Sequence, residues 1–176
     1  GGSLKEILRV SCNTAFAEIG AEYIGPSLLQ KTAERFGFNE TIPFDVPTAT
    51  SYFPTDFGKE LSVVTTPEGE STGIPIVENT PLLAQAAIGQ YEVAATPLQM
   101  ALVASAIAGQ GNTPSPYLVK EILNHKGELV TRTLNSIWQQ TMEASTAELL
   151  REGMKEIVDS GTAQRLAING FNYWSK

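Results

Sequence analysis

A proline-rich stretch between Phe38 and Pro81 constrains the fold of this chain more than any other feature. Five prolines interrupt it: Pro43, Pro47, Pro54, Pro67 and Pro75. Proline fixes its own φ angle and lacks a backbone N–H, so neither a long helix nor a central strand can cross this stretch. We expect a long irregular segment with one short strand near residues 61–65. Long ordered loops of this kind are often functional.

Three helices are predicted before this stretch. The first ends at residue 10, the second is capped by Asn13 or Thr14, and the third begins at Pro26 and ends at Gly37. In the second helix, spacings of three, four and seven residues predict that four residues share one packed face: Phe16, Ile19, Gly20 and Tyr23.

Helices and a hairpin are predicted after the stretch. Order returns at residues 82–88, and a capping box at residues 96–99 opens a buried helix of small residues that Gly109 ends in a left-handed conformation. Two β-prone runs, 117–123 and 128–134, flank a turn that contains His125 and Gly127 and form a hairpin. A second capping box at residues 145–148 opens a helix that Gly161 ends.

Composition excludes several classes of protein. The net charge is −7 without a Lys/Arg cluster, so nucleic acid is not an expected partner. The apolar runs fall short of the roughly 20 residues that a membrane span needs, so the chain itself is not expected to contact a membrane. With a single cysteine, Cys12, it has no internal disulfide and no thiol cluster for zinc. We expect no cofactor, no metal, and a buried Cys12 side chain.

A set of motifs spread along the chain resembles the transpeptidase domain of class B penicillin-binding proteins. Ser11-Cys12-Asn13 opens an amphipathic helix, and three further segments follow in order and at matching spacing: Ile88-Gly89-Gln90, Thr96-Pro97-Leu98-Gln99-Met100-Ala101, and Pro116-Tyr117-Leu118-Val119. Taken alone, Ser-Cys-Asn-Thr is a common helix cap. The combination is far more specific, and it covers nearly the whole chain.

The resemblance implies an α+β fold of the serine transpeptidase and β-lactamase type. In that fold a five-stranded sheet is flanked by helices and joined to a helical region. Residues 1–176 are expected to form a partial domain that supplies mostly the helical region and a small part of the sheet.

The family's site is built from Ser-x-x-Lys, Ser-x-Asn and Lys-Thr-Gly or Lys-Ser-Gly motifs. By resemblance, Ser11 passes a proton to the departing amine, and Asn13 holds a substrate carbonyl and the lysine partner. An amide suits this role because it both donates and accepts hydrogen bonds. No Ser-x-x-Lys occurs in the chain, so we expect it upstream. Lys176 is either the first residue of the third motif or a terminal lysine without a role.

The resemblance implies a peptidoglycan D,D-transpeptidase that cross-links stem peptides through an acyl-serine and binds β-lactams when complete. It acts at the extracytoplasmic face of a membrane to which the parent protein is anchored. Cell-division or elongation proteins are further candidate partners. The chain by itself is expected to be inactive. Two alternatives remain open: a non-catalytic penicillin-binding sensor or scaffold, and a serine β-lactamase.

Overall fold

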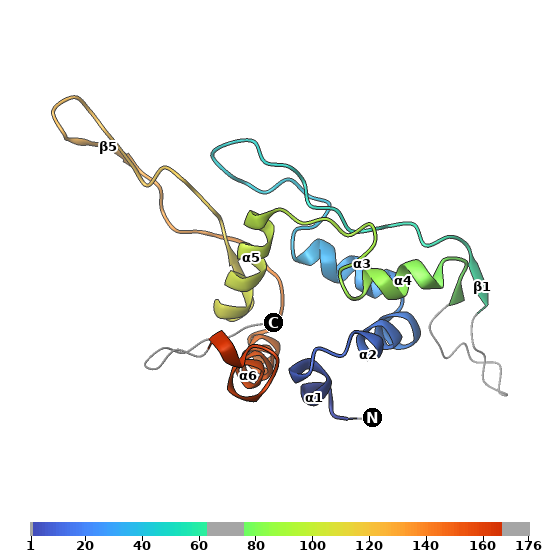
Figure 1. Cartoon of the computed structure of the whole chain (residues 1–176). Helices are drawn as coiled ribbons and strands as arrows, with labels where there is room; N and C mark the ends of the chain where they lie inside the picture. Colours follow the sequence, from blue (N-terminus) through green and yellow to red (C-terminus); the bar gives the residue numbers. More distant parts are fainter. Residues whose placement is uncertain (1, 63–75, 167–176) are drawn as a thin grey trace.

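The computed structural model describes residues 2–62 and 76–166. Helices form the body of the molecule, and a long hairpin arm extends from it (Figure 1). The first four helical elements, in chain order, are α1 (Leu4–Arg9), α2 (Asn13–Glu18), η1 (Ile19–Ile24) and α3 (Pro26–Arg35).

The second predicted helix is two elements, because α2 continues directly into the π-helix η1. A π-helix holds more residues per turn than an α-helix, so side chains after the change rotate away from the face that α-helical spacing predicts. Gly20 is buried as expected, but Tyr23 is 70% exposed. The prediction of one shared face is therefore wrong for Tyr23.

The ends of these helices agree only partly with prediction. Cys12 occupies the N-cap of α2 without a side-chain hydrogen bond, so the predicted cap by Asn13 or Thr14 is wrong. The predicted ends of α3 are confirmed: Pro26 is its first residue, and Gly37 follows it with a φ of 89°.

The proline-rich stretch is irregular but well anchored where the structure describes it. Two short antiparallel strands, β1 (Glu60–Ser62) and β2 (Ile76–Val77), pair within it, so the predicted strand near 61–65 is confirmed as far as residue 62. The Asn39 side chain makes two hydrogen bonds with the backbone of Phe53, at 3.0 and 2.9 Å. These bonds hold the loop where Phe53 and Phe57 enter the core.

The main hydrophobic core joins this loop to α4 (Thr80–Ala86). Its buried members are Phe53, Phe57, Val77, Leu82, Leu83 and Ala86. Two of these six residues, Phe53 and Phe57, thus come from a segment that lacks regular secondary structure, and Val77 comes from β2.

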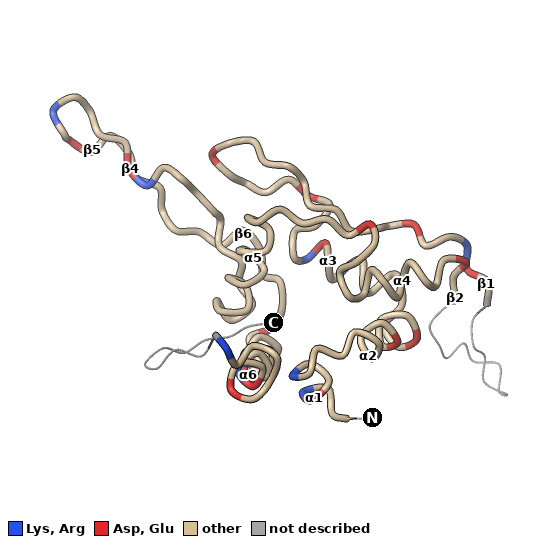
Figure 2. Tube along the Cα trace, in the orientation of Figure 1, with Lys and Arg blue, Asp and Glu red and all other residues tan. Residues whose placement is uncertain are grey.

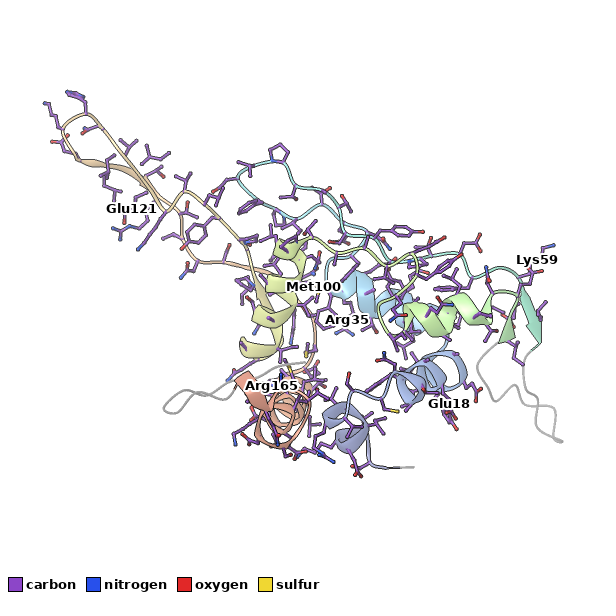
Figure 3. All side chains as sticks on the ribbon, in the orientation of Figure 1. Glu18, Arg35, Lys59, Met100, Glu121 and Arg165 are labelled. Carbon is purple, nitrogen blue, oxygen red and sulfur yellow. The ribbon has the colours of Figure 1, made fainter. Side chains whose placement is uncertain are left out.

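Helix α5 (Pro97–Ala108) begins as predicted, because the Thr96 hydroxyl accepts a hydrogen bond from the Gln99 amide at 3.0 Å. The reciprocal half of the capping box is wrong: the Gln99 side chain donates to the Phe36 carbonyl. The helix is also not wholly buried, since Met100, labelled in Figure 3, is 52% exposed. Gly109 keeps a φ of −86°, and Gln110 and Gly111 adopt the left-handed conformation expected of it.

The rest of the described chain forms two more strand pairs and a long helix. Strand β3 (Asn112–Pro114) pairs with β6 (Ile137–Gln140), and β4 (Glu121–Leu123) pairs with β5 (Leu129–Arg132) in the predicted hairpin. Helix α6 (Ala144–Ser160) and the 3₁₀ turn η2 (Gln164–Leu166) follow. Because Glu143 is the N-cap of α6 and makes no side-chain capping bond, the second predicted capping box is wrong.

Candidate active site

Helix α1 ends in a turn that places Ser11 in a left-handed conformation. The Ser11 amide donates to the Leu8 carbonyl at 3.0 Å, and the Cys12 amide donates to the Ile7 carbonyl at 2.9 Å. This pair of bonds is the Schellman motif, which satisfies carbonyls at the end of a helix. It gives Ser11 a φ of 56°.

Glycine is the usual residue at this position of the motif, because a Cβ atom is unfavourable at positive φ. The same turn closes α4, where Gly89 and Gln90 donate to the carbonyls of Ala86 and Gln85, each at 3.0 Å. There the left-handed position is Gly89, with a φ of 72°. Non-glycine residues held in this region cost about 1–3 kcal/mol and cluster at functional sites. Ser11 is therefore a candidate for a role that requires its hydroxyl.

Asn13 begins the next helix, two residues after Ser11. It is exposed and lines a hollow of about 240 Å³. The other lining residues are apolar: Leu8, Phe16, Ala87 and Ile88. The hollow thus combines apolar side chains with one side-chain amide, which can both donate and accept hydrogen bonds. The three elements around it are α1, α2 and the end of α4.

Close packing of α2–η1 against α4 positions Asn13. A Cβ atom on Gly20 would overlap the Cβ of Ala87, so glycine is needed for this approach. The motif around Gly89 predicted a role for this segment but did not predict the hollow beside it. Ala87 and Ile88 immediately precede that glycine, so the motif lies next to two of the lining residues. That Phe16 lines the same hollow depends on tertiary packing.

The remaining predicted residues have different outcomes. Cys12 is only partly buried, so the expectation of a buried side chain is wrong; as the residue between a left-handed turn and a new helix, it lies near the surface. His125 lies in an exposed turn, as predicted. Lys176 lies outside the described residues.

Within residues 2–62 and 76–166, no group of three or more His, Cys, Asp and Glu side chains is placed to hold a metal ion. Nor does any helix in those ranges have both the length and the apolarity needed to cross a membrane.

Comparison with known proteins places this geometry in a family. The family model described as the penicillin binding protein transpeptidase domain matches residues 1–176. The peptidoglycan D,D-transpeptidase PbpA of Mycolicibacterium smegmatis is 33% identical over 174 residues, which are 99% of this chain and 31% of the relative. PbpA of Mycobacterium tuberculosis is 31% identical with the same coverage. The chain thus spans about a third of the length of these curated relatives.

Solved structures agree with this match. PBPA from Mycobacterium tuberculosis superimposes with a TM-score of 0.79 at 27% identity, over 97% of this chain and 35% of the other. Its imipenem acyl-enzyme complex gives a TM-score of 0.76 at 28% identity, with coverages of 96% and 34%. The D,D-transpeptidase domain of a peptidoglycan glycosyltransferase from Eggerthella lenta gives 0.74 at 29% identity, with coverages of 97% and 40%.

These matches confirm the predicted α+β serine transpeptidase fold and the family resemblance on which it depended. The chain belongs to the penicillin-binding protein transpeptidase domain family.

Proposed function

We propose that this chain forms the Ser-x-Asn part of a peptidoglycan D,D-transpeptidase, which cross-links stem peptides through an acyl-serine intermediate. The observation that carries the proposal is the left-handed Ser11 at the end of α1, followed by Asn13 beside the hollow. A serine at a position that favours glycine needs a reason, and proton transfer supplies one. The named function of the PbpA relatives supports the same reading.

The proposed reaction begins at a nucleophilic serine in a Ser-x-x-Lys motif outside this chain. Its oxygen attacks the carbonyl carbon of the D-alanyl-D-alanine peptide bond and loses its proton to the adjacent base. When the C–N bond breaks, the Ser11 hydroxyl passes a proton to the departing amine and takes back the proton that the base removed from the nucleophile. The terminal D-alanine leaves, and an amine from a second stem peptide then takes the acyl group. A neutral hydroxyl can relay the proton without adding charge to the site.

Asn13 has a binding role in this scheme. Its side-chain N–H donates to a carbonyl of the substrate, while its oxygen accepts from the lysine of Ser-x-x-Lys. An ionised aspartate at this position would accept only and would lose the contact with the substrate carbonyl. The hollow lined by Leu8, Phe16 and Ile88 is beside this amide.

The extent of the site follows from the motifs. Residues 1–176 contain no Ser-x-x-Lys, so the chain on its own is a partial domain that lacks the nucleophile and is inactive. Lys176 is proposed as the lysine of the third motif, and a terminal lysine without a role is the alternative. The complete protein is proposed to be membrane-anchored, to act on the extracytoplasmic side where peptidoglycan is built, to bind β-lactams, and to work with cell-division or elongation proteins.

A fluorescent penicillin tests this proposal. We expect covalent labelling of the complete protein and no labelling of the 176-residue chain. Gel fluorescence and intact-protein mass spectrometry measure the labelling. In the complete protein, Ser11→Ala should lower the acylation rate constant by about 10²-fold or more, the range for loss of a proton-transfer group. Ser105→Ala is the matched control, because the Ser105 hydroxyl donates to the Ala101 carbonyl within α5, at 2.8 Å.

The other outcomes separate the alternatives. Stable labelling of the isolated chain would overturn the motif assignment. Rapid release of the label by the complete protein would indicate a β-lactamase. Labelling without any cross-linking of stem peptides would indicate a sensor or scaffold. Normal acylation of the Ser11→Ala variant would remove Ser11 from the mechanism.

A further inference from the structure

The turn that carries Ser11 is tied to the C-terminal end of α6 by a pair of reciprocal contacts. The Arg9 guanidinium donates from Nη1 to the Ser160 carbonyl at 3.1 Å, and the Thr162 amide donates to the Arg9 carbonyl at 3.4 Å. Both carbonyls are at helix ends, where the helix itself offers no partner. Each segment therefore satisfies an unpaired backbone group of the other.

Two further features favour this contact. A cation near the last turn of a helix interacts favourably with the helix dipole, and the Arg9 side chain is only 31% exposed. Gly161 lets the two backbones approach, because a Cβ atom there would lie 2.5 Å from the Arg9 carbonyl oxygen. The contact thus requires a long, charged side chain at one position and glycine at the other.

A second residue of α1 contacts α6 differently. Lys5 lies one turn before Arg9 and forms ion pairs with Glu156 at 2.8 Å and Glu152 at 3.7 Å. Figure 2 shows the basic positions of α1 beside the acidic positions of α6. These pairs join the same two helices, but they lie away from the Ser11 turn and from residues 160–163. Lys5 is therefore a natural control for any effect of simple helix docking.

We propose that Arg9 is a positioning residue that, together with Gly161, clamps the Ser11 turn on the end of α6. This role rests on the proposed function of Ser11. A left-handed serine persists only when its surroundings hold it there, and Arg9 is two residues from Ser11 in the same turn. Because the Arg9 carbonyl and side chain are both bonded to residues 160–162, the Ser11 turn is fixed in position relative to the end of α6.

Acylation kinetics of the complete protein test the proposal. Arg9→Met keeps most of the apolar stem and removes the donors. We expect it to lower the acylation rate constant for a fluorescent penicillin by about tenfold or more, because small displacements of a catalytic group have effects of this size. The rate constant is measured per labelled site at saturation, so a loss of folded protein does not mimic the effect. Arg9→Lys, which retains one donor group, should recover part of the rate.

Lys5→Met is the matched control and should leave the rate constant within about twofold of the parent protein, whatever its effect on Tm. Equal losses of rate in Arg9→Met and Lys5→Met, or an unchanged rate in Arg9→Met, would overturn the proposal. Ser11→Ala distinguishes failure of the positioning role of Arg9 from failure of the proposed function of Ser11. If Ser11→Ala slows acylation and Arg9→Met does not, only the positioning role fails. If Ser11→Ala has no effect, the proposed function of Ser11 fails first.

Discussion

At the scale of single residues, two helix-ending turns with the same hydrogen bonds differ in the residue at the left-handed position. Gly89 takes the left-handed position after α4, and Ser11 takes it after α1. Of these two residues, only Ser11 has a Cβ atom, which makes a positive φ unfavourable. A serine at this position is expected where activity depends on a strained residue.

We predict that Ser11→Gly raises stability and lowers activity together. Removal of the Cβ at a φ of 56° should increase the free energy of unfolding by about 1 kcal/mol, the lower end of the cost of such a conformation. Acylation by a fluorescent penicillin should fall as it does for Ser11→Ala. Thermal unfolding and acylation kinetics of the complete protein measure the two effects.

Tyr91→Gly is the control for this prediction. Tyr91 also has a positive φ, 62°, and its side chain is 68% exposed. This variant should gain stability without any loss of acylation rate. A Ser11→Gly protein that is less stable than the parent would show that contacts of the serine side chain outweigh its backbone strain.

At the scale of elements, the contact between η1 and α4 depends on small residues. Gly20 is buried against Ala87, and any larger side chain would push the two elements apart. Because Ala87 also lines the hollow at Asn13, this spacing affects both packing and the site.

Gly20→Ala is expected to destabilise the protein by about 1–3 kcal/mol, the usual cost of overpacking a core. The double variant Gly20→Ala with Ala87→Gly should recover most of the loss, because it moves the methyl group from one element to the other. A double-mutant cycle on urea unfolding measures the coupling. Additive effects of the two substitutions would contradict direct contact between these positions.

A second link between elements holds the hairpin arm, which carries Glu121 away from the helical body (Figure 3). The Asp45 carboxylate accepts hydrogen bonds from the amides of Val119 and Leu118, at 2.8 and 2.6 Å. These bonds, that of Val119 first, hold the pKa of Asp45 below its ordinary value of 3.8. The proline-rich loop thereby anchors the base of the arm.

The lowered pKa of Asp45 gives the direction of a pH effect. Its stabilising contribution is complete above the unfolded value and is lost as the pH falls through the lower folded value. We therefore expect the Leu118 and Val119 amides to be protected from hydrogen exchange at pH 6 and to lose protection, relative to intrinsic exchange, only when the pH falls below the ordinary Asp value of 3.8. Asp45→Ala should lack the protection at both pH values. Protection that persists in Asp45→Ala would show that other contacts hold the arm.

At the scale of the whole molecule, the described residues expose large apolar side chains on the hairpin arm. These side chains are Ile122, Leu123, Leu129 and Val130, each about half exposed or more.

We predict that the isolated chain binds an apolar dye such as ANS and unfolds at least about 10 °C below the complete protein, since each kcal/mol of lost packing lowers Tm by 2–4 °C in a domain of this size. Dye fluorescence and thermal unfolding of both proteins, compared at equal molar concentration, measure the effect. Equal Tm values and no dye binding would show that the chain is stable by itself.

Local chemistry explains the parts of this fold that the sequence predicted. Proline and glycine set the start and end of α3, the Thr96 hydroxyl starts α5, and the alternating runs around His125 form the hairpin. Each of these outcomes depends on residues within a few positions of one another. Two failed predictions depended on features that the local pattern does not reveal. The Gln99 side chain donates to the distant Phe36 carbonyl instead of completing the helix cap, and Tyr23 is exposed because α2 continues as a π-helix.

The same division holds for the candidate site. The sequence by itself determined that Ser11 and Asn13 lie in a turn between two helices, and that this turn belongs with the segments around Gly89 and Thr96. Only the tertiary structure decided that Ser11 is left-handed and that the end of α6 holds its turn through Arg9. Motif spacing reflects chemistry along the chain, whereas the left-handed conformation of Ser11 is held by the hydrogen bonds of the turn that ends α1 and by the contact of that turn with α6.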